Sequence, residues 1–221
     1  MNFLGFDTEK RFDYENGFYL TSDITRLAKI ISHYELYKMI KELPGHVVEC
    51  GVFKGASFIR WATFRDILEN PYSRKIIGFD IFGEFPDTGF EPDKEIRQKF
   101  IDEAGNLSIS EEEFRGVLEY KNFKNCELVQ GDINETVPEY VRMNPQLKIA
   151  LLHIDTDIYE PAKTTLEHMY DKIVKGGIVV FDDYGTFPGE TKAVDDFFAG
   201  SGHQIKKFSF SHHIPSFIIK E

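Results

Sequence analysis

The chain has 221 residues, of which 26 are Lys or Arg and 37 are Asp or Glu, so its formal net charge is −11. Hydrophobic residues make up 42% of it, which is typical of a folded protein rather than a disordered one. The excess of acids argues against general binding to nucleic acid or to anionic membranes, because both need a basic surface. Ordinary solubility explains the same acidity equally well.

The two cysteines, Cys50 and Cys126, stand far apart in strand-like runs and do not form a CxxC pair. We therefore expect neither a disulfide framework nor structural zinc. No stretch approaches about 18 consecutive apolar residues, so no membrane span is expected. The N-terminus lacks the apolar core of a signal peptide. Together these features predict a cytoplasmic protein.

The first clear helix pattern runs from Ser22 to Leu43, with Ser22 or Asp23 as its cap and Pro44-Gly45 at its end. We take residues 1–45 as a helical N-terminal region. Continuously apolar runs, typical of strands buried on both faces of a parallel sheet, follow at residues 46–50, 75–79, 126–129, 148–154 and 177–181. Helix patterns separate several of them, at residues 56–68, 161–174 and 190–198.

This alternation predicts one Rossmann-like domain, with a doubly wound, mostly parallel α/β sheet. The tail, residues 204–210 and 214–220, reads as a C-terminal antiparallel hairpin that turns at His212 and His213. The connection from Ile81 to Asn125 is far longer than a normal α/β loop and contains helix-like pieces at 93–103 and 111–121. We expect residues 84–122 to form a helical lid over the sheet.

Three turns at the carboxyl ends of the first three strands indicate a nucleoside site. The first, ECGVFKGAS at residues 49–57, opens a helix; Gly51 permits a tight turn and Gly55 a close approach, although the GxGxxG fingerprint is missing. The second strand ends in Asp80, where Rossmann-like folds bind ribose hydroxyls. A Gly-Asp pair at 131–132 ends the third, on the nucleobase side. Singly, each turn is equally well explained as a structural turn or a helix cap.

Acids follow the fourth and fifth strands, at Asp155, Asp157, Asp182 and Asp183. If these strands are parallel neighbours, the carboxylates converge and repel one another unless a proton or a cation neutralises them. Mg²⁺, which prefers oxygen ligands, is the simplest such cation. Helix capping by one or two of the acids is the alternative. We expect only one of Asp155 and Asp157 to be a ligand.

The segments VVECGVFKGAS, HIDTDIYEPAKTTLEHMYDKIVKGGIVVFDDYG and TKAVDDFF resemble the macrocin O-methyltransferase (TylF/MycF-like) family. The resemblance implies an S-adenosylmethionine- and Mg²⁺-dependent methyltransferase that acts on a sugar hydroxyl. It implies metal ligands at Asp157, Asp182 and Asp183, with Asp157 also as the general base. His153 is a second candidate base, although a core position explains it as well. The expected cofactor residues are Glu49, Gly51, Gly55, Ser57, Asp80, Phe82, Gly131, Asp132 and Asp155.

The sequence departs from the family pattern at Ile81, which replaces a serine, and at Thr156, which replaces a glycine. The chain is short for an enzyme acting on large macrolides, which favours a smaller, nucleotide-linked or polysaccharide sugar as the acceptor. Catechol-type methylation of an aromatic diol remains open, since it uses the same cofactor and metal. An NAD-dependent oxidoreductase is disfavoured by the missing GxGxxG, and a non-enzymatic binding module by the retained acids. The resemblance also implies a homodimer.

Overall fold

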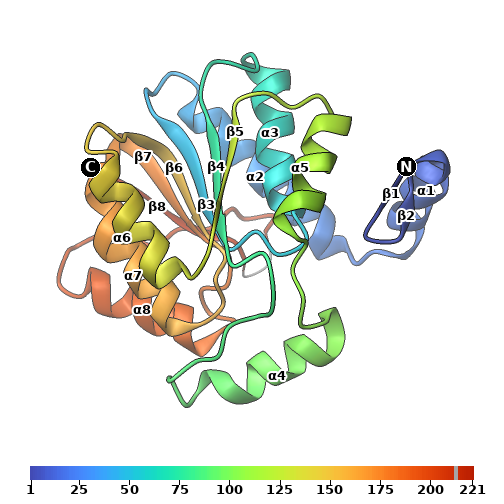
Figure 1. Cartoon of the computed structure of the whole chain (residues 1–221). Coiled ribbons are helices and arrows are strands. Elements are labelled where there is room, and N and C mark those ends of the chain that lie inside the picture. Colours follow the sequence, from blue (N-terminus) through green and yellow to red (C-terminus); the bar gives the residue numbers. More distant parts are fainter. Residues whose placement is uncertain (212–213) are drawn as a thin grey trace.

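A computed structural model describes residues 1–211 and 214–221 of the chain (Figure 1). Its centre is a six-stranded sheet in the order β5-β4-β3-β6-β7-β8. The strands are β3 (His46–Cys50), β4 (Ile76–Asp80), β5 (Cys126–Gln130), β6 (Ile149–Ile154), β7 (Ile173–Phe181) and β8 (Ser216–Ile219). All pairings are parallel except that of β7 with β8. The mostly parallel, Rossmann-like sheet is thereby confirmed.

Helices cover both faces of this sheet (Figure 1). One face carries α2 (Ile24–Ile40), α3 (Ala56–Leu68) and α5 (Glu111–Tyr120). The other carries α6 (Ile133–Met143), α7 (Tyr159–Met169), the short η2 (Tyr170–Lys172) and α8 (Pro188–Phe198). Successive strand residues point to opposite faces. Val47 accordingly packs in one core cluster and Val48 in the other, which explains why the strands read as continuous apolar runs.

Helix α6 and the C-terminal tail are among the segments that differ from the sequence predictions. Helix α6, which the sequence pattern did not reveal, contains Pro138, and an internal proline obscures a helical pattern. The helix begins where the Asp132 carboxylate accepts the N–H of Asn134 at 2.8 Å. In the tail, residues 204–210 form no regular strand, and one isolated bridge joins Lys206 to Phe217 of β8. The predicted turn at residues 212–213 lies outside the described residues.

The insertion between β4 and β5 divides into two parts with different surroundings. Its second helix, α5, buries Phe114 and Leu118 in the main core, where the Phe114 ring lies over Gly55. Its first helix, α4 (Asp93–Ala104), lies apart from the helical layers, near the bottom of Figure 1. Of the region 84–122, α5 thus belongs to the main core, whereas α4 lies outside both helical layers.

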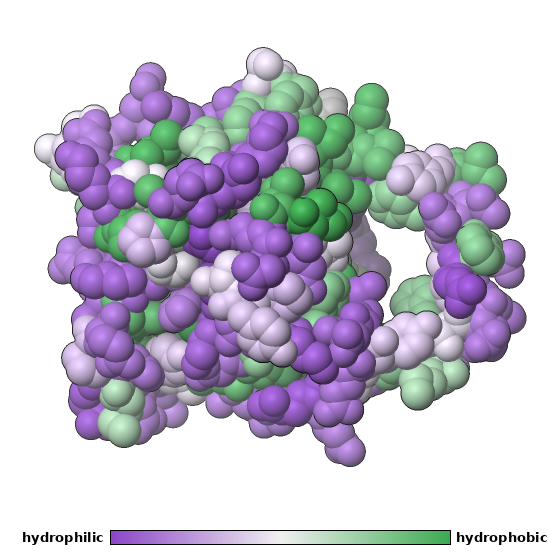
Figure 2. Space-filling view, turned by 90° about the horizontal axis from the view of Figure 1, so that it is seen from above, coloured by the Kyte–Doolittle hydropathy of each residue, from purple (hydrophilic) through white to green (hydrophobic). Residues whose placement is uncertain are grey.

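Residues 1–21 form an N-terminal arm. It comprises β1 (Asn2–Phe3), β2 (Phe6–Asp7), η1 (Thr8–Lys10) and α1 (Arg11–Thr21). Figure 2 shows the arm standing off the body, and a groove of about 720 Å³ separates it from α3 and α5. The arm contacts α5 through the N–H of Leu4, which donates to Glu113 at 2.6 Å. None of the helices in the described part of the chain has the length and apolar character needed to cross a bilayer.

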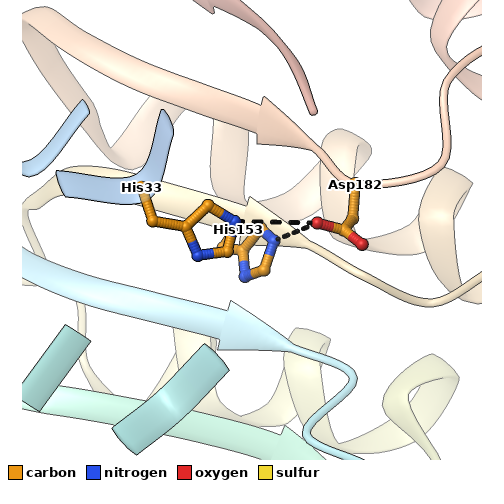
Figure 3. Close-up of side chains that lie close together, drawn as sticks. All are labelled: His33, His153 and Asp182. Carbon is orange, nitrogen blue, oxygen red and sulfur yellow. Dashed lines mark hydrogen bonds and ion pairs between the residues drawn. The ribbon is translucent and has the colours of Figure 1, made fainter. Parts of the chain in front are cut away.

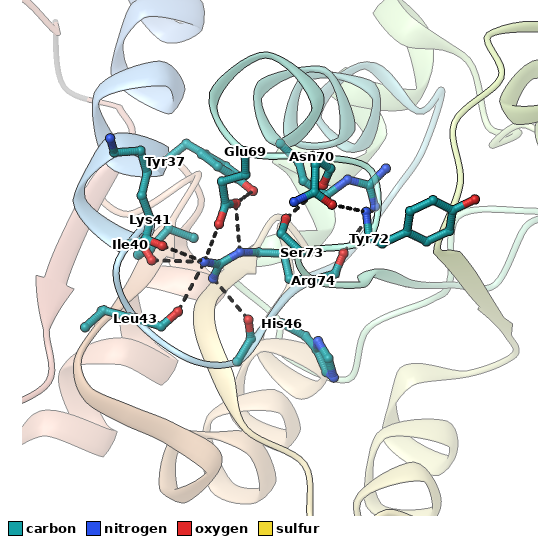
Figure 4. Close-up of polar contacts among 12 residues, drawn as sticks. Tyr37, Ile40, Lys41, Leu43, His46, Glu69, Asn70, Tyr72, Ser73 and Arg74 are labelled. Atoms are coloured by element: carbon teal, nitrogen blue, oxygen red, sulfur yellow. Dashed lines mark hydrogen bonds and ion pairs between the residues drawn. The ribbon is translucent and has the colours of Figure 1, made fainter.

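A buried arginine attaches α2 to the sheet at the edge opposite the carboxyl ends (Figure 4). The Arg74 guanidinium is paired with Glu69 at 2.8 Å. It also donates to the backbone oxygens of Ile40, Lys41, Leu43 and Gly45 at 3.0–3.2 Å. The last carbonyls of a helix have no partner within the helix. Arg74 therefore caps α2 and fixes the start of the connection to β3.

Candidate functional site

The topology places a candidate site between β3 and β6, where the strand order reverses direction. Gly51, directly after β3, makes the close contact of the two strand ends possible. Its φ is +90°, and a Cβ atom there would overlap the backbone oxygen of Asp155. Any other residue at this position would push the two loops apart.

Asp80, at the end of β4, organises the loop that follows β3. Its carboxylate accepts hydrogen bonds from the backbone N–H groups of Val52 at 2.7 Å, Phe53 at 3.0 Å and Phe82 at 2.6 Å. These bonds place the carboxylate at the wall of a cavity. The sequence predicted a ribose ligand here, and the structure adds a loop-ordering role that the sequence did not reveal.

The cavity at this edge has a volume of about 300 Å³. Its wall is formed by the loops that follow β3, β4, β5 and β6 and by the insertion, which contributes Phe85 and Phe100. The sequence-predicted site residues in its wall are Gly51, Asp80, Asp132, Asp155 and Asp157. The three turns that the sequence analysis proposed for a nucleoside site thus meet at one cavity.

Other predicted cofactor residues lie behind this wall. Gly55 faces the Phe114 ring, and Phe82 is buried in the same core cluster. Ser57 is buried on α3, and Gly131, with a φ of +136°, shapes the turn before α6. Glu49 points to the other side of β3, toward His153. The structure therefore assigns these side chains to supporting the wall rather than to forming its surface.

Carboxylates gather beside the cavity. Oxygens of Asp155, Asp182 and Asp183 lie within 4.8 Å of one another. Strand pairing continues up to this point, because the N–H of Asp155 donates to Cys50 and that of Asp182 to Ile154, both at 2.9 Å. Burial and the charge of Asp182 raise the pKa of Asp155 well above its ordinary value. Burial and the charge of Asp157 do the same to the pKa of Asp183.

Two further acids adjoin this group. Asp157 has a φ of +62°, a left-handed conformation that non-glycine residues rarely adopt and that is often found at functional sites. Its side chain is hydrogen-bonded to that of Asp183, and burial and the charge of Asp155 raise its pKa. Glu190, buried on α8, accepts the N–H of Asp183 at 2.9 Å. The sequence analysis missed Glu190, which looks like an ordinary acid in the first turn of a helix.

Asp182 differs from its neighbours because basic side chains surround it (Figure 3). One carboxylate oxygen lies 3.2 Å from His153 Nε2 and 3.8 Å from His33 Nε2. The other contacts the ammonium group of Lys29, on α2. Despite burial, Lys29 foremost and then His153 hold the pKa of Asp182 well below its ordinary value. Burial lowers the pKa of His33 to about 3, so this imidazole is neutral. No sequence motif marks Lys29 or His33, which belong to a helix about 150 residues upstream of Asp182.

His153 is completely buried between two acids. Its Nδ1 lies 2.9 Å from Glu49, and its Nε2 faces Asp182. Burial would lower its pKa, but the hydrogen bonds to Asp182 and Glu49 raise the pKa of His153 to about 10. Through these two contacts His153 links β3, β6 and β7 beneath the acid cluster.

A family model described as Macrocin-O-methyltransferase (TylF) matches residues 24–207. Demethyldecarbamoylnovobiocin O-methyltransferase from Streptomyces niveus is 32% identical over 165 residues, which are 70% of this chain and 58% of that protein. A second relative, 8-demethyl-8-(2,3-dimethoxy-alpha-L-rhamnosyl)-tetracenomycin-C 4'-O-methyltransferase from Streptomyces olivaceus, is 28% identical over 149 residues, 64% of this chain and 54% of the relative.

Among solved structures, CalS11, a calicheamicin methyltransferase, superposes with a TM-score of 0.76 at 28% identity. The match covers 96% of this chain and 85% of CalS11. The superposition on this solved methyltransferase therefore covers nearly all of the chain. By contrast, the chain spans only 58% and 54% of the lengths of these two curated relatives.

Proposed function

Because this chain belongs to the macrocin O-methyltransferase (TylF) family, we propose that it transfers a methyl group from S-adenosylmethionine to a hydroxyl of a sugar-containing acceptor. The observation that carries the proposal is the cavity at the switch point of the sheet, bordered by the acid cluster. The name of the tetracenomycin relative describes a rhamnosyl substrate, which supports a sugar as the acceptor.

The wall of the cavity fits S-adenosylmethionine in three places. Gly51 leaves space that a Cβ atom would fill, so that a ligand can approach the backbone. Asp80 presents a fixed carboxylate of the kind that binds ribose hydroxyls. Asp132, at the N-terminus of α6, lies on the proposed adenine side.

We propose that Mg²⁺ binds between Asp155, Asp182 and Asp183. The donors are carboxylate oxygens, which a hard divalent cation prefers, and the raised pKa values of Asp155 and Asp183 reflect negative charge that is not fully neutralised. Geometry favours Asp155 over the sequence-predicted Asp157 as the third ligand, because its oxygen belongs to the 4.8 Å group. When bound, the ion would lower the pKa of an acceptor hydroxyl.

Asp157 is the proposed general base. It lines the cavity, and its backbone strain turns the residue away from the continuing strand. The acceptor oxygen would attack the methyl carbon in line with the departing sulfur, so that alignment supplies much of the rate. His153 is less suited to proton transfer with the acceptor, since it is buried between Glu49 and Asp182 and positions the latter. The part of the insertion up to α4 would exclude water.

A methyl-transfer screen with labelled S-adenosylmethionine tests the proposal. The panel contains nucleotide-linked sugars, glycosylated natural products and simple catechols, each with Mg²⁺ or with a chelator. We expect Mg²⁺-dependent labelling of a sugar. Labelling of catechols alone would instead establish the aromatic-diol alternative, and binding of NAD rather than S-adenosylhomocysteine would contradict methyl transfer altogether.

We further propose that the protein is a homodimer. No residue of α1 is buried, and large apolar side chains of this helix, including Phe12, Tyr19 and Leu20, are exposed. Surfaces of this kind commonly mark interaction sites. Light scattering of the full chain and of a Phe12→Ser/Leu20→Ser variant tests this proposal, which predicts a monomeric variant. The cytoplasmic location remains a prediction from the sequence.

A further inference from the structure

The contact between Lys29 and Asp182 leads to an inference that rests on the proposed Mg²⁺ site. We propose that Lys29 is a built-in competitor of the divalent cation: its ammonium group holds one oxygen of Asp182 in the metal-free protein and leaves that oxygen when the ion binds. In this view α2, which precedes the whole sheet in the chain, sets the metal affinity of the site.

The first support is that the two carboxylate oxygens of Asp182 have different partners. One oxygen faces His153 and His33 from beneath. The other contacts the Lys29 ammonium. Because His153 is fully buried and also bound to Glu49, it cannot withdraw. The oxygen that Lys29 occupies is therefore the one that can be released to a metal ion.

The second support is the charge distribution. Lys29 interacts not only with Asp182 but also with Asp155 and Asp183, so that its ammonium is opposed to the same three carboxylates that are grouped as metal ligands. One positive charge only partly neutralises three carboxylates, whereas a divalent cation neutralises more. A lysine and a metal ion in this space also repel each other, which weakens the binding of either one while the other is present.

The third support is that Lys29 can leave. Its side chain is 14% exposed, while that of Asp182 is 3% exposed, so the lysine has a path to solvent. Its four-carbon stem is flexible, and an ammonium group is strongly hydrated. Withdrawal therefore requires a change of side-chain rotamer and no movement of α2.

Binding of Mn²⁺, used as a spectroscopic stand-in for Mg²⁺, tests the inference on the full-length chain without cofactor. Dissociation constants are measured by electron paramagnetic resonance for the wild type, Lys29→Met, Lys29→Arg and Asp182→Asn. Lys38→Met is the matched control, because Lys38 lies on the same helix, is 42% exposed and is paired with Glu35. We expect Lys29→Met to bind Mn²⁺ about tenfold or more tightly than the wild type. Lys29→Arg and Lys38→Met should resemble the wild type.

A second measurement uses the wild type alone, so that it holds even if Lys29→Met does not fold. Brief amine acetylation followed by mass spectrometry should show faster labelling of Lys29 when Mn²⁺ is added and unchanged labelling of Lys38. Equal or weaker Mn²⁺ binding by a folded Lys29→Met variant, or Lys29 labelling that does not rise, overturns this inference while leaving the metal site intact. Absence of Mn²⁺ binding in every variant overturns the metal site itself.

Discussion

The carboxylate of Asp93, at the start of α4, accepts a 2.6 Å hydrogen bond from the backbone N–H of Gly189, at the start of α8. It also accepts the N–H of Tyr159 at 3.0 Å, so one buried side chain satisfies the first turns of both α7 and α8. A Cβ atom at Gly189 would overlap this carboxylate. Asp93 thus fastens the insertion next to the cavity.

Replacing Asp93 by Ala should release α4. Loss of two buried hydrogen bonds to a charged group is expected to cost about 2–4 kcal/mol of stability and to raise the KM for the acceptor more than it lowers kcat. Limited proteolysis should cut residues 84–104 faster. Asp102→Ala, at the exposed end of the same helix, serves as the control. Equal cleavage rates in the two variants would show that Asp93 does not anchor the insertion.

Gly51→Ala should disrupt the cofactor site, because the new Cβ atom meets the backbone of Asp155 and the positive φ strains the residue. We expect S-adenosylhomocysteine to bind at least about tenfold more weakly, a loss of ~1.4 kcal/mol or more, as measured by calorimetry. Gly17→Ala, in an exposed helix with no atom near its Cβ position, should bind normally. Wild-type affinity in Gly51→Ala would place the cofactor elsewhere.

Asp182→Asn and Asp183→Asn remove the same charge but should affect the metal-free protein differently. Asp182 pairs with both Lys29 and His153, so its loss removes a buried carboxylate from two cationic partners and is expected to cost about 3–5 kcal/mol. Asp183 is opposed by Asp157, so its loss relieves repulsion and should leave the free energy of unfolding unchanged or higher. Both variants should lose metal-dependent turnover. Denaturant unfolding with and without chelator measures the stabilities, and activity assays measure the turnover. Metal-dependent turnover retained in either variant would show that the replaced aspartate is not a required ligand, and turnover that persists with chelator present would contradict the metal role.

Metal affinity should increase with pH. The pKa values of Asp155 and Asp183, two of the proposed metal ligands, are raised, so protons remain on these carboxyl groups at pH values at which ordinary aspartates have lost them. A cation must displace these protons, and its apparent affinity therefore rises until the pH exceeds the raised pKa values. Mn²⁺ titrations at several pH values between about 5 and 8 should show this slope. The slope should be smaller in Asp183→Asn. A flat profile in the wild type would contradict the link between proton release and metal binding.

Arg74→Met should destabilise the fold without affecting the chemistry. The variant leaves Glu69 and the terminal carbonyls of α2 without their buried donor, at a cost of about 3 kcal/mol. Chemical denaturation measures this loss, and kcat for the folded fraction should stay within about twofold, less than ~0.5 kcal/mol. Arg142→Met, at a position where the side chain is 69% exposed, should change stability by less than about 0.5 kcal/mol. A similar small effect at Arg74 would show that α2 is held by packing alone.

Local patterns in the sequence were sufficient for the sheet and for most helices. Strand β3 and helix α3 have the predicted bounds, 46–50 and 56–68, because their apolar periodicity and flanking turns depend only on near neighbours. The gathering of acids followed in the same way, since the carboxyl ends of parallel neighbours share one edge. The N-terminal hairpin and α6 escaped prediction, the latter because of Pro138.

Contacts between distant segments decided the rest. The sequence identified Asp155 and Asp157 as alternatives, but the left-handed turn at Asp157 determines that Asp155 joins Asp182 and Asp183. Likewise Phe114 places α5 in the core rather than in a lid. Lys29 carries no local signal, because its role arises only where α2 packs beside the end of β7. Sequence by itself determined which chemical groups reach the carboxyl edge; tertiary packing decided which of them face one another, since electrostatic pairing depends on distance in space and not along the chain.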